Sequence, residues 1–108
     1  MSNEKLEDFI LLMKNNYPDF LAFTQEQILG TVWNRPGLSQ RDRSLITVAA
    51  LVACDHPTEL VFHLGRALDN GVTKDELKEV MFHMAVYGGW PSAVTAMASA
   101  AEVFKSRK

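Results

Sequence analysis

Apolar residues recur every three or four positions along nearly all of this 108-residue chain, and no stretch alternates apolar and polar side chains as a half-buried strand would. A spacing near 3.6 residues gathers the apolar side chains on one face of a helix, and that face needs a partner to cover it. The length is that of one domain. The pattern therefore predicts an all-α chain in which residues 1–108 form a single domain of about six helices.

Breakers and capping residues divide the first half of the chain. The first two predicted helices end near residues 17–18 and at the Asn-Arg-Pro-Gly breaker of residues 34–37. Ser39, followed three positions later by Asp42, resembles a capping box and opens a third helix. From 45 to 54 this helix is apolar on nearly every face, so we expect it to be the buried central element.

The second half carries clearer boundaries. Pro57 suits the first turn of a fourth helix, where its missing N–H costs nothing, and Asn70-Gly71 is typical of a left-handed C-cap. Thr73 and Glu76 form a capping box for a fifth helix. Pro91 begins a sixth helix whose many small residues permit close helix approach.

Composition excludes several classes of function. The chain is 47% hydrophobic with a formal net charge of -2 and no basic run. It therefore lacks the cluster of basic residues that is typical of nucleic-acid-binding proteins. Residues 1–8 are acidic and polar, unlike a secretory signal, and the longest apolar run, 48–54, is far shorter than the roughly 20 residues of a membrane span. We expect a cytoplasmic protein. Cys54 has no partner for an internal disulfide and is expected to be an inert core residue, so any chemistry is acid–base.

Glu59 and His63 form the most suggestive pair. A spacing of four residues places both side chains on one helix face, where a carboxylate raises the pKa of an imidazole and orients it. Such an imidazole suits proton transfer near neutral pH. An exposed ion pair that only supports the helix fits the same spacing.

His83 lies in an apolar stretch that continues to Tyr87, a glycine pair and Trp90. This segment fits the wall of a pocket or a simple hydrophobic bend, and His83 fits a catalytic or a buried structural role. The glycines allow close backbone approach.

The same stretch offers candidate ligands for a metal, and several arginines are candidates for binding an anion. His56, Glu59 and His63 do not have the His-Glu-x-x-His spacing, and we expect no metal. Guanidinium groups match carboxylates bidentately, so an acidic substrate would need one or two of the arginines at 35, 41, 43 and 66.

Several motifs together resemble the carboxymuconolactone decarboxylase family. The resemblance covers about residues 21–104, and its motifs occur in the family's order: Gly30 to Ser39, Arg41 to Thr47, Glu59-Leu60 with His63, Arg66 to Thr73, Glu76 to Val80, and His83 to Ala93. It implies an alkylhydroperoxidase-like orthogonal helical fold assembled into a ring-like homo-oligomer, a homo-trimer or homo-hexamer, with active sites near subunit contacts.

Within this superfamily, the peroxidase branch resembles the chain less well. That branch carries a Cys-x-x-Cys pair where this sequence has His56 and Glu59. Thiol peroxidase chemistry needs a reactive thiolate and a resolving thiol, and both positions lack them.

The decarboxylase branch, which acts in aromatic-compound degradation, has a glutamate and a histidine at the positions of Glu59 and His63. It implies CO₂ loss from a small carboxylated lactone and reprotonation of the resulting dienolate, without metal or organic cofactor. His63 would donate the proton or bind the oxyanion, with Glu59 orienting it and His83 as a second candidate.

Substrate recognition follows from the same resemblance. Arg41 and Arg43 would bind carboxylates, and Tyr87 and Trp90 would form walls. Residues 55–58 depart from the family's Gly-Arg-aromatic pattern, which bears on how the lactone carboxylate is held. A non-catalytic oligomeric member of the family is the alternative.

Overall fold

The computed structural model describes the backbone of residues 3–107 and the side chains of residues 5–107. This part of the chain contains no strand, which confirms the all-α prediction. Its elements, in chain order, are α1 (Asn3–Asn16), α2 (Pro18–Phe23), the π-helix η1 (Thr24–Val32), α3 (Gln40–Ala53), α4 (Pro57–Asp69), α5 (Lys74–Tyr87) and α6 (Trp90–Ser106). Within residues 3–107, no helix combines the length and the apolar character needed to cross a bilayer.

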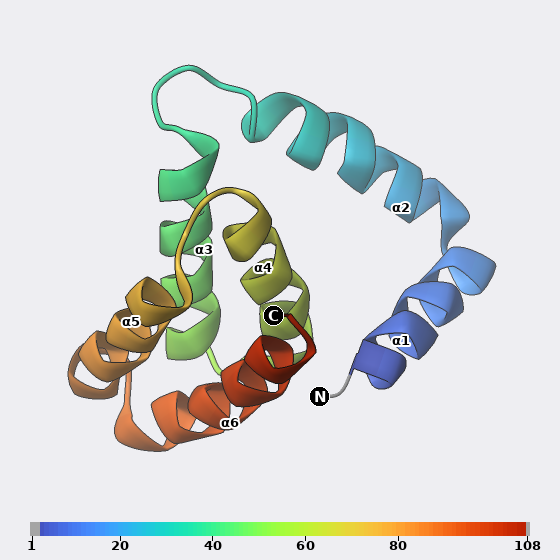
Figure 1. The fold of residues 1–108 in the computed structure, drawn as a ribbon. Helices are drawn as coiled ribbons and strands as arrows, with labels where there is room; N and C mark the ends of the chain where they lie inside the picture. Colours follow the sequence, from blue (N-terminus) through green and yellow to red (C-terminus); the bar gives the residue numbers. More distant parts are fainter. Residues whose placement is uncertain (1–2, 108) are drawn as a thin grey trace.

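Helices α3 to α6 form the core (Figure 1). Helix α3 packs against α4, α5 and α6, while α6 also packs along α4 and α5. Helix α4 buries the most continuous stripe, because its apolar residues follow a 3.6-residue period. The buried cluster consists of Val48, Val52, Leu60, Val61, Leu64, Ala67, Val72, Leu77, Met81, Ala93, Ala96, Ala100 and Val103.

The predicted helix ends are confirmed. The Ser39 side chain accepts a hydrogen bond from the backbone N–H of Asp42 at 3.0 Å, and Thr73 and Glu76 make both bonds of a capping box. Gly71 has φ +97°, the left-handed conformation that a glycine adopts without strain. Local sequence signals therefore fix where α3 and α5 begin and where α4 ends.

The prediction that α3 is buried on all sides is wrong. Only Ser44, Val48 and Val52 are buried, whereas Ile46 is 56% exposed. The companion prediction for Cys54 is also wrong, because this residue caps the helix at the exposed α3–α4 turn. One face of α3 suffices to pack against three neighbouring helices, so its remaining apolar side chains face outward.

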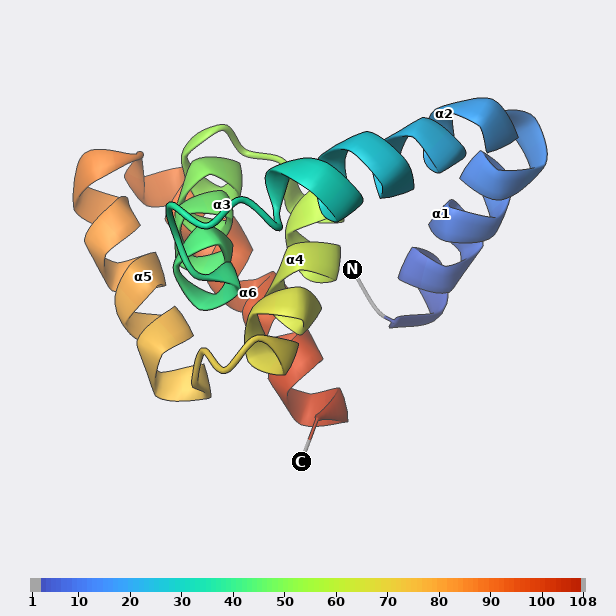
Figure 2. The same cartoon turned by 90° about the horizontal axis from the view of Figure 1, so that it is seen from above.

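The N-terminal arm, defined as α1, α2 and η1, projects away from this core (Figures 1 and 2). It touches the core mainly where α1 meets α4. Large apolar side chains along it stay exposed: Ile10, Leu11, Leu12, Tyr17, Phe20, Phe23, Ile28 and Val32. Exposed apolar surface of this extent marks an interaction surface.

Candidate functional site

His63 lies in the middle of α4, among aromatic groups. Its ring stacks on Trp33, with centroids 5.9 Å apart and planes at 15°, and meets the Phe62 ring edge-on at 5.1 Å. Its Nδ1 atom is buried and has no hydrogen-bond partner among the described residues. A buried polar atom without a partner is costly to a fold and is characteristic of a ligand-ready site.

Burial lowers the pKa of His63 from 6.5 to about 4, and the positive charge of Arg66 adds to this effect. The prediction that Glu59 leaves His63 with a raised pKa is wrong, because Glu59 is exposed and its upward effect is outweighed by burial and by Arg66. His63 is therefore a neutral imidazole at pH 7. A neutral imidazole donates one N–H and accepts at the other nitrogen.

Trp33 is positioned by the end of the π-helix. Its backbone N–H bonds to the carbonyl of Ile28 at 3.0 Å, five residues back, which is the π-helical pattern. The side chain is only 6% exposed because it is covered on the His63 side. The wider π turn at the end of the arm thus positions the indole ring of Trp33 against α4.

Arg66 lies one turn after His63 on α4 and covers the same indole. Its guanidinium carbon is 4.8 Å from the centroid of the Trp33 ring, a cation–π geometry. Its Nε is buried without a partner, and no described carboxylate pairs with it. Arg66 is therefore a cation held in place by stacking, with donors left over for a ligand.

Arg43 shares this unsatisfied character. Its Nη2 donates to the carbonyl of Arg35 at 3.0 Å, while its Nε is buried without a partner in the described chain. A bond from Asn70 Nδ2 to Ser44 Oγ, at 3.0 Å, sets the register of the antiparallel pair α3–α4. The start of α3 therefore lies beside the end of α4, so Arg43 and Arg66 lie at the same end of this helix pair.

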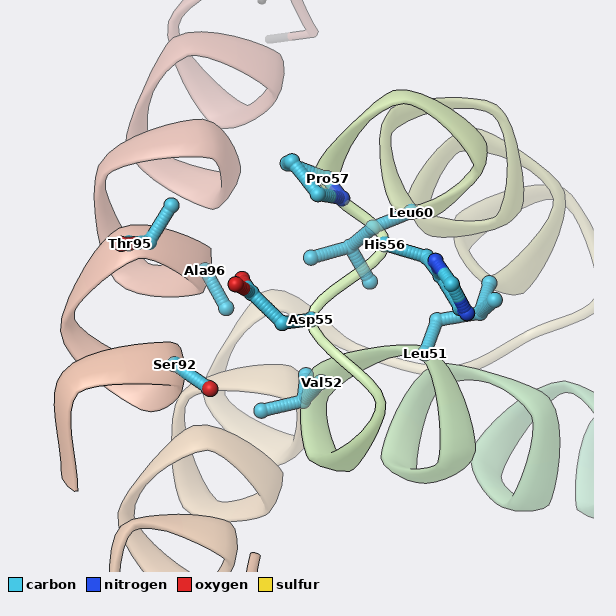
Figure 3. Close-up of a pocket in the computed structure, with 9 residues that line it drawn as sticks. All are labelled: Leu51, Val52, Asp55, His56, Pro57, Leu60, Ser92, Thr95 and Ala96. Atoms are coloured by element: carbon cyan, nitrogen blue, oxygen red, sulfur yellow. The ribbon is translucent and has the colours of Figure 1, made fainter. Parts of the chain in front are cut away.

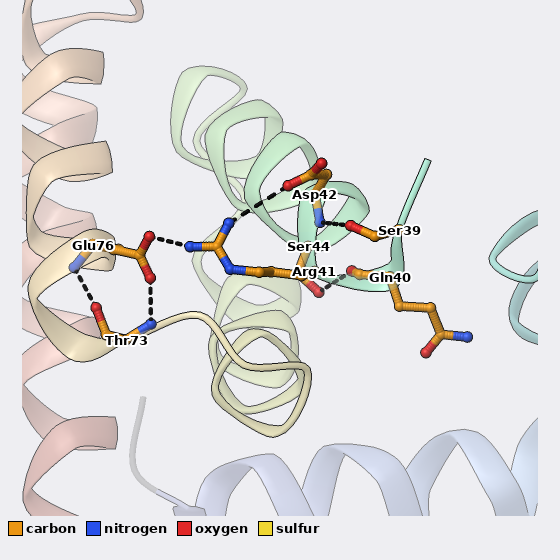
Figure 4. A network of polar contacts seen from close by, with 7 residues as sticks. All are labelled: Ser39, Gln40, Arg41, Asp42, Ser44, Thr73 and Glu76. Carbon is orange, nitrogen blue, oxygen red and sulfur yellow. Dashed lines mark hydrogen bonds and ion pairs between the residues drawn. The ribbon is translucent and has the colours of Figure 1, made fainter. Parts of the chain in front are cut away.

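Arg41 is used differently (Figure 4). One of its terminal nitrogens pairs with Glu76 and the other lies 3.5 Å from Asp42. The backbone N–H of Thr73, followed by Arg41, holds the pKa of Glu76 below its usual value. The pair with Glu76 joins the beginning of α3 to the beginning of α5, so this guanidinium is engaged within the chain.

His83, Tyr87 and Trp90 gather at the α5–α6 corner, away from His63 in the same chain. The His83 and Tyr87 rings are 4.8 Å apart, and Tyr87 and Trp90 are 76% and 69% exposed. Helix α3 lies between α5 and α4 (Figure 2). His83 and Tyr87 contact each other and Trp90 begins the next helix, and no ring contact, hydrogen bond or ion pair among the described residues joins any of the three to His63.

Gly88 makes this corner possible. A Cβ atom on it would lie 3.1 Å from the Cα of Ala53, so only a glycine lets the end of α5 approach the end of α3 this closely. The next residue, Gly89, has φ +116° and turns the chain into α6. The glycine pair therefore serves both close approach and a change of direction.

Two hollows in the described chain lie elsewhere, and neither is lined by His63 or Glu59. The first, beside the α3–α4 turn, is lined by Asp55, His56 and residues of α6 and has no room for a water molecule (Figure 3). The second lies between α1, α4 and α6. Among the described residues no group of three His, Cys, Asp or Glu is placed to hold a metal ion.

His63 was predicted from the sequence as a site residue and stays a prediction, whereas its neighbours Trp33 and Arg66 were not singled out as site residues. The signal for Arg66 was its spacing of three residues from His63, which places both on one helix face. Trp33 had no comparable signal, because its contact joins residues that are 30 positions apart in the sequence.

Comparisons with known proteins agree with this architecture. Residues 18–102 match the carboxymuconolactone decarboxylase family. The chain is 45% identical over 104 residues to the 4-carboxymuconolactone decarboxylase of Acinetobacter baylyi, covering 96% of this chain and 72% of that protein. It is 46% identical over 68 residues to the nitrosuccinic acid decarboxylase of Metarhizium robertsii, covering 63% of this chain and 48% of that protein. An uncharacterised 15.0 kDa protein of Paracoccus denitrificans is 33% identical over 106 residues, covering 94% of this chain and 78% of that protein.

Proposed function

Because this chain belongs to the carboxymuconolactone decarboxylase family, we propose that it is a decarboxylase acting on a small carboxylated lactone. Two of its relatives are named as decarboxylases, and their substrates differ although both are carboxylic acids. The shared element is the loss of CO₂ from a small acid. A lactone with a conjugated C=C bond accepts the electron pair itself, so the proposed reaction needs no metal and no organic cofactor.

The observation that carries the proposal is the His63–Trp33–Arg66 stack. It combines a neutral, half-buried imidazole with a guanidinium that has no carboxylate partner among the described residues. An anionic substrate would supply the missing partner for Arg66, and its developing oxyanion would meet the imidazole. Groups fixed in advance where charge develops are the largest source of catalysis in many enzymes.

The proposed reaction begins with recognition of carboxylates by Arg66 and Arg43. Arginine forks bind carboxylates bidentately, which orients the ring. The bond between the ring carbon and the reacting carboxylate then breaks, CO₂ leaves, and its electron pair moves through the C=C bond to the lactone carbonyl. His63 donates an N–H hydrogen bond to the resulting dienolate oxygen.

The second step returns a proton to carbon, so that one proton is consumed for each CO₂ released. Burial is the first cause of the low pKa of His63, and the charge of Arg66 is the second. The negative dienolate beside the ring would oppose the first, and a substrate carboxylate on Arg66 would offset the second. The imidazole then takes up a proton, and Glu59 favours that charged form. The imidazolium hands the proton to the dienolate carbon and returns to its neutral state.

A second copy of the chain would enclose this site. No Asp, Glu, Lys or Arg occurs from residue 80 to residue 101, and the α5–α6 corner exposes Phe82, Val86, Tyr87, Trp90, Val94 and Met97. Its aromatic rings alone leave roughly 400 Å² uncovered, about half of what one partner contributes to a standard interface. We place His83, Tyr87 and Trp90 at this contact in a homo-trimer or homo-hexamer, where they would act as walls of a neighbouring site.

The decisive experiment incubates the purified protein with 4-carboxymuconolactone and follows CO₂ release. We expect turnover in the wild-type protein and in His56→Ala, which changes the exposed histidine at the N-cap of the same helix. We expect loss of turnover by at least about 100-fold in His63→Ala. Unchanged turnover in His63→Ala would exclude the proposed mechanism.

The assembly has its own test. Light scattering after size-exclusion chromatography should show an oligomer for the wild-type chain and smaller species for Trp90→Glu, because a charge at the centre of an apolar contact is unpaired. A monomeric wild-type protein would contradict the proposed assembly.

The alternative is an oligomeric member of the family that binds small acids without turning them over. It is favoured by one observation, that neither described hollow is lined by His63 or Glu59. Binding of the lactone without CO₂ release, in a protein shown to be oligomeric, would establish this alternative.

A further inference from the structure

A separate hollow of about 150 Å³ opens between α1, α4 and α6. Of the arm, only Leu6 of α1 lines it, opposite residues of α4 and of the C-terminal end of α6. Its lining is mixed: the apolar side chains of Leu6, Val61, Phe62 and Val103, the backbone of Gly65, and the charged groups of Arg66, Asp69 and Arg107.

The charges in this lining do not cancel. Arg107 Nη1 pairs with Asp69 Oδ1 at 2.6 Å, which leaves these two groups neutral together. Arg66 has no carboxylate partner in the described chain. Among the described residues of its lining, the hollow therefore carries one positive charge without an ion-pair partner, beside apolar walls, a combination that favours an organic anion over a neutral molecule or a cation.

The size of the hollow limits that anion. A cavity of about 150 Å³ accepts a molecule the size of benzene. Gly65 helps to shape the floor, because a Cβ there would lie 3.0 Å from Arg107 Nη2. Without that Cβ, the guanidinium lies directly over α4 at the rim.

We propose that this hollow is a second binding site, for a ring-sized organic monocarboxylate, which adjoins the His63 site and shares Arg66 with it. The ring would occupy the apolar part between Leu6, Phe62 and Val103, and the carboxylate would pair with Arg66. This inference goes beyond the proposed decarboxylation and does not depend on it. Since Arg66 also covers Trp33, an occupied hollow would alter the charge that His63 experiences.

The test uses benzoate as the probe and benzyl alcohol as its neutral counterpart, with binding followed by heteronuclear NMR on the full chain. We expect benzoate to shift amide signals of α1, α4 and α6 in a saturable way, and benzyl alcohol to bind at least about tenfold more weakly. No saturable shift with benzoate, or equal binding of benzyl alcohol, would overturn the proposal.

Variants separate the hollow from the His63 site. Arg107→Gln leaves Asp69 unpaired at the rim, and Leu6→Trp fills the mouth, so both should weaken benzoate binding about tenfold or more. Arg35→Gln, an exposed arginine outside the hollow, and His63→Ala should leave it unchanged. If instead His63→Ala abolishes binding while Arg107→Gln does not, benzoate occupies the catalytic site and the proposal fails.

The outcome is independent of catalysis. Benzoate binding that maps to the hollow stands even if the protein releases no CO₂ from the lactone. Conversely, a protein that decarboxylates the lactone but shows no benzoate shifts in α1 and α6 keeps its function and loses this site.

Discussion

Two clusters of polar groups differ in how many of their hydrogen-bonding atoms have partners. In the first, Arg41, Glu76 and Thr73 provide partners for one another, and the ion pair is roughly two-fifths exposed (Figure 4). In the second, His63 and Arg66 are held by Trp33, yet His63 Nδ1 and Arg66 Nε are buried without partners among the described residues.

This difference separates architecture from binding. A satisfied cluster gains nothing from a ligand and serves to join α3 to α5. A cluster with buried unsatisfied atoms costs the fold free energy, and a ligand that supplies the missing partners recovers that cost. The lowered pKa of His63 in this cluster also favours a functional role.

Replacing one arginine in each cluster should give the largest contrast. Arg66→Gln removes the unpaired cation and should lower kcat/KM for a carboxylated substrate about 10- to 100-fold, the value of a charge-assisted hydrogen bond. Arg41→Gln should leave kcat/KM within about twofold, because its charge is already engaged by Glu76. Steady-state kinetics on both variants measures the contrast, and an equal loss in Arg41→Gln would break it.

Acid should destabilise the protein through the second cluster. The pKa of His63 is about 4 in the folded chain and 6.5 when unfolded, so the unfolded state binds more protons between these values. The contribution of His63 is fully present above pH 6.5 and is lost as the pH falls towards 4. Allowing for partial exposure, we expect the free energy of unfolding to drop by about 1.5 kcal/mol from pH 7 to pH 5.

Urea unfolding at the two pH values measures this drop. His63→Gln should remove most of it, since glutamine does not titrate, whereas His56→Gln at an exposed position should keep it. The window ends at pH 5 because Glu76, whose pKa is lowered, begins to contribute only in more acidic solution. An unchanged drop in His63→Gln would show that the buried imidazole is not its source.

Much of the fold is readable from local sequence. Thr73, Glu76 and Gly71 act within one turn of the backbone, so their roles follow from residue type and spacing alone. The burial of α3 is not readable in this way. Ile46 and Cys54 are as apolar as Val48, and only the positions of α4, α5 and α6 decide which of them is covered.

In the candidate site, too, local features were predictable from the sequence and long-range contacts were not. His63 and Glu59 are four residues apart on one helix, so their common face was predictable, but no hydrogen bond or ion pair joins them among the described residues. The contact of Trp33 with His63 depends on the π-helical end of the arm, and a nine-residue π-helix has no reliable sequence signature. Arg41 and Arg43 look equivalent in the sequence, and only the position of Glu76 on α5 distinguishes them.

The smallest expected effect belongs to the satisfied cluster. Thr73→Ala removes the hydroxyl that accepts the Glu76 backbone N–H at 3.0 Å and should lower the free energy of unfolding by about 1 kcal/mol, as loss of an N-cap generally does. Thr95→Ala, on an exposed face of α6, is the matched control and should be neutral or slightly stabilising, because alanine favours a helix interior. Since Thr73 bonds to Glu76 and not to His63 or Arg66, kcat/KM should not change in either variant. A loss of activity in Thr73→Ala without a loss of stability would mean that the capped end of α5 belongs to the site, and the division between the two clusters would no longer hold.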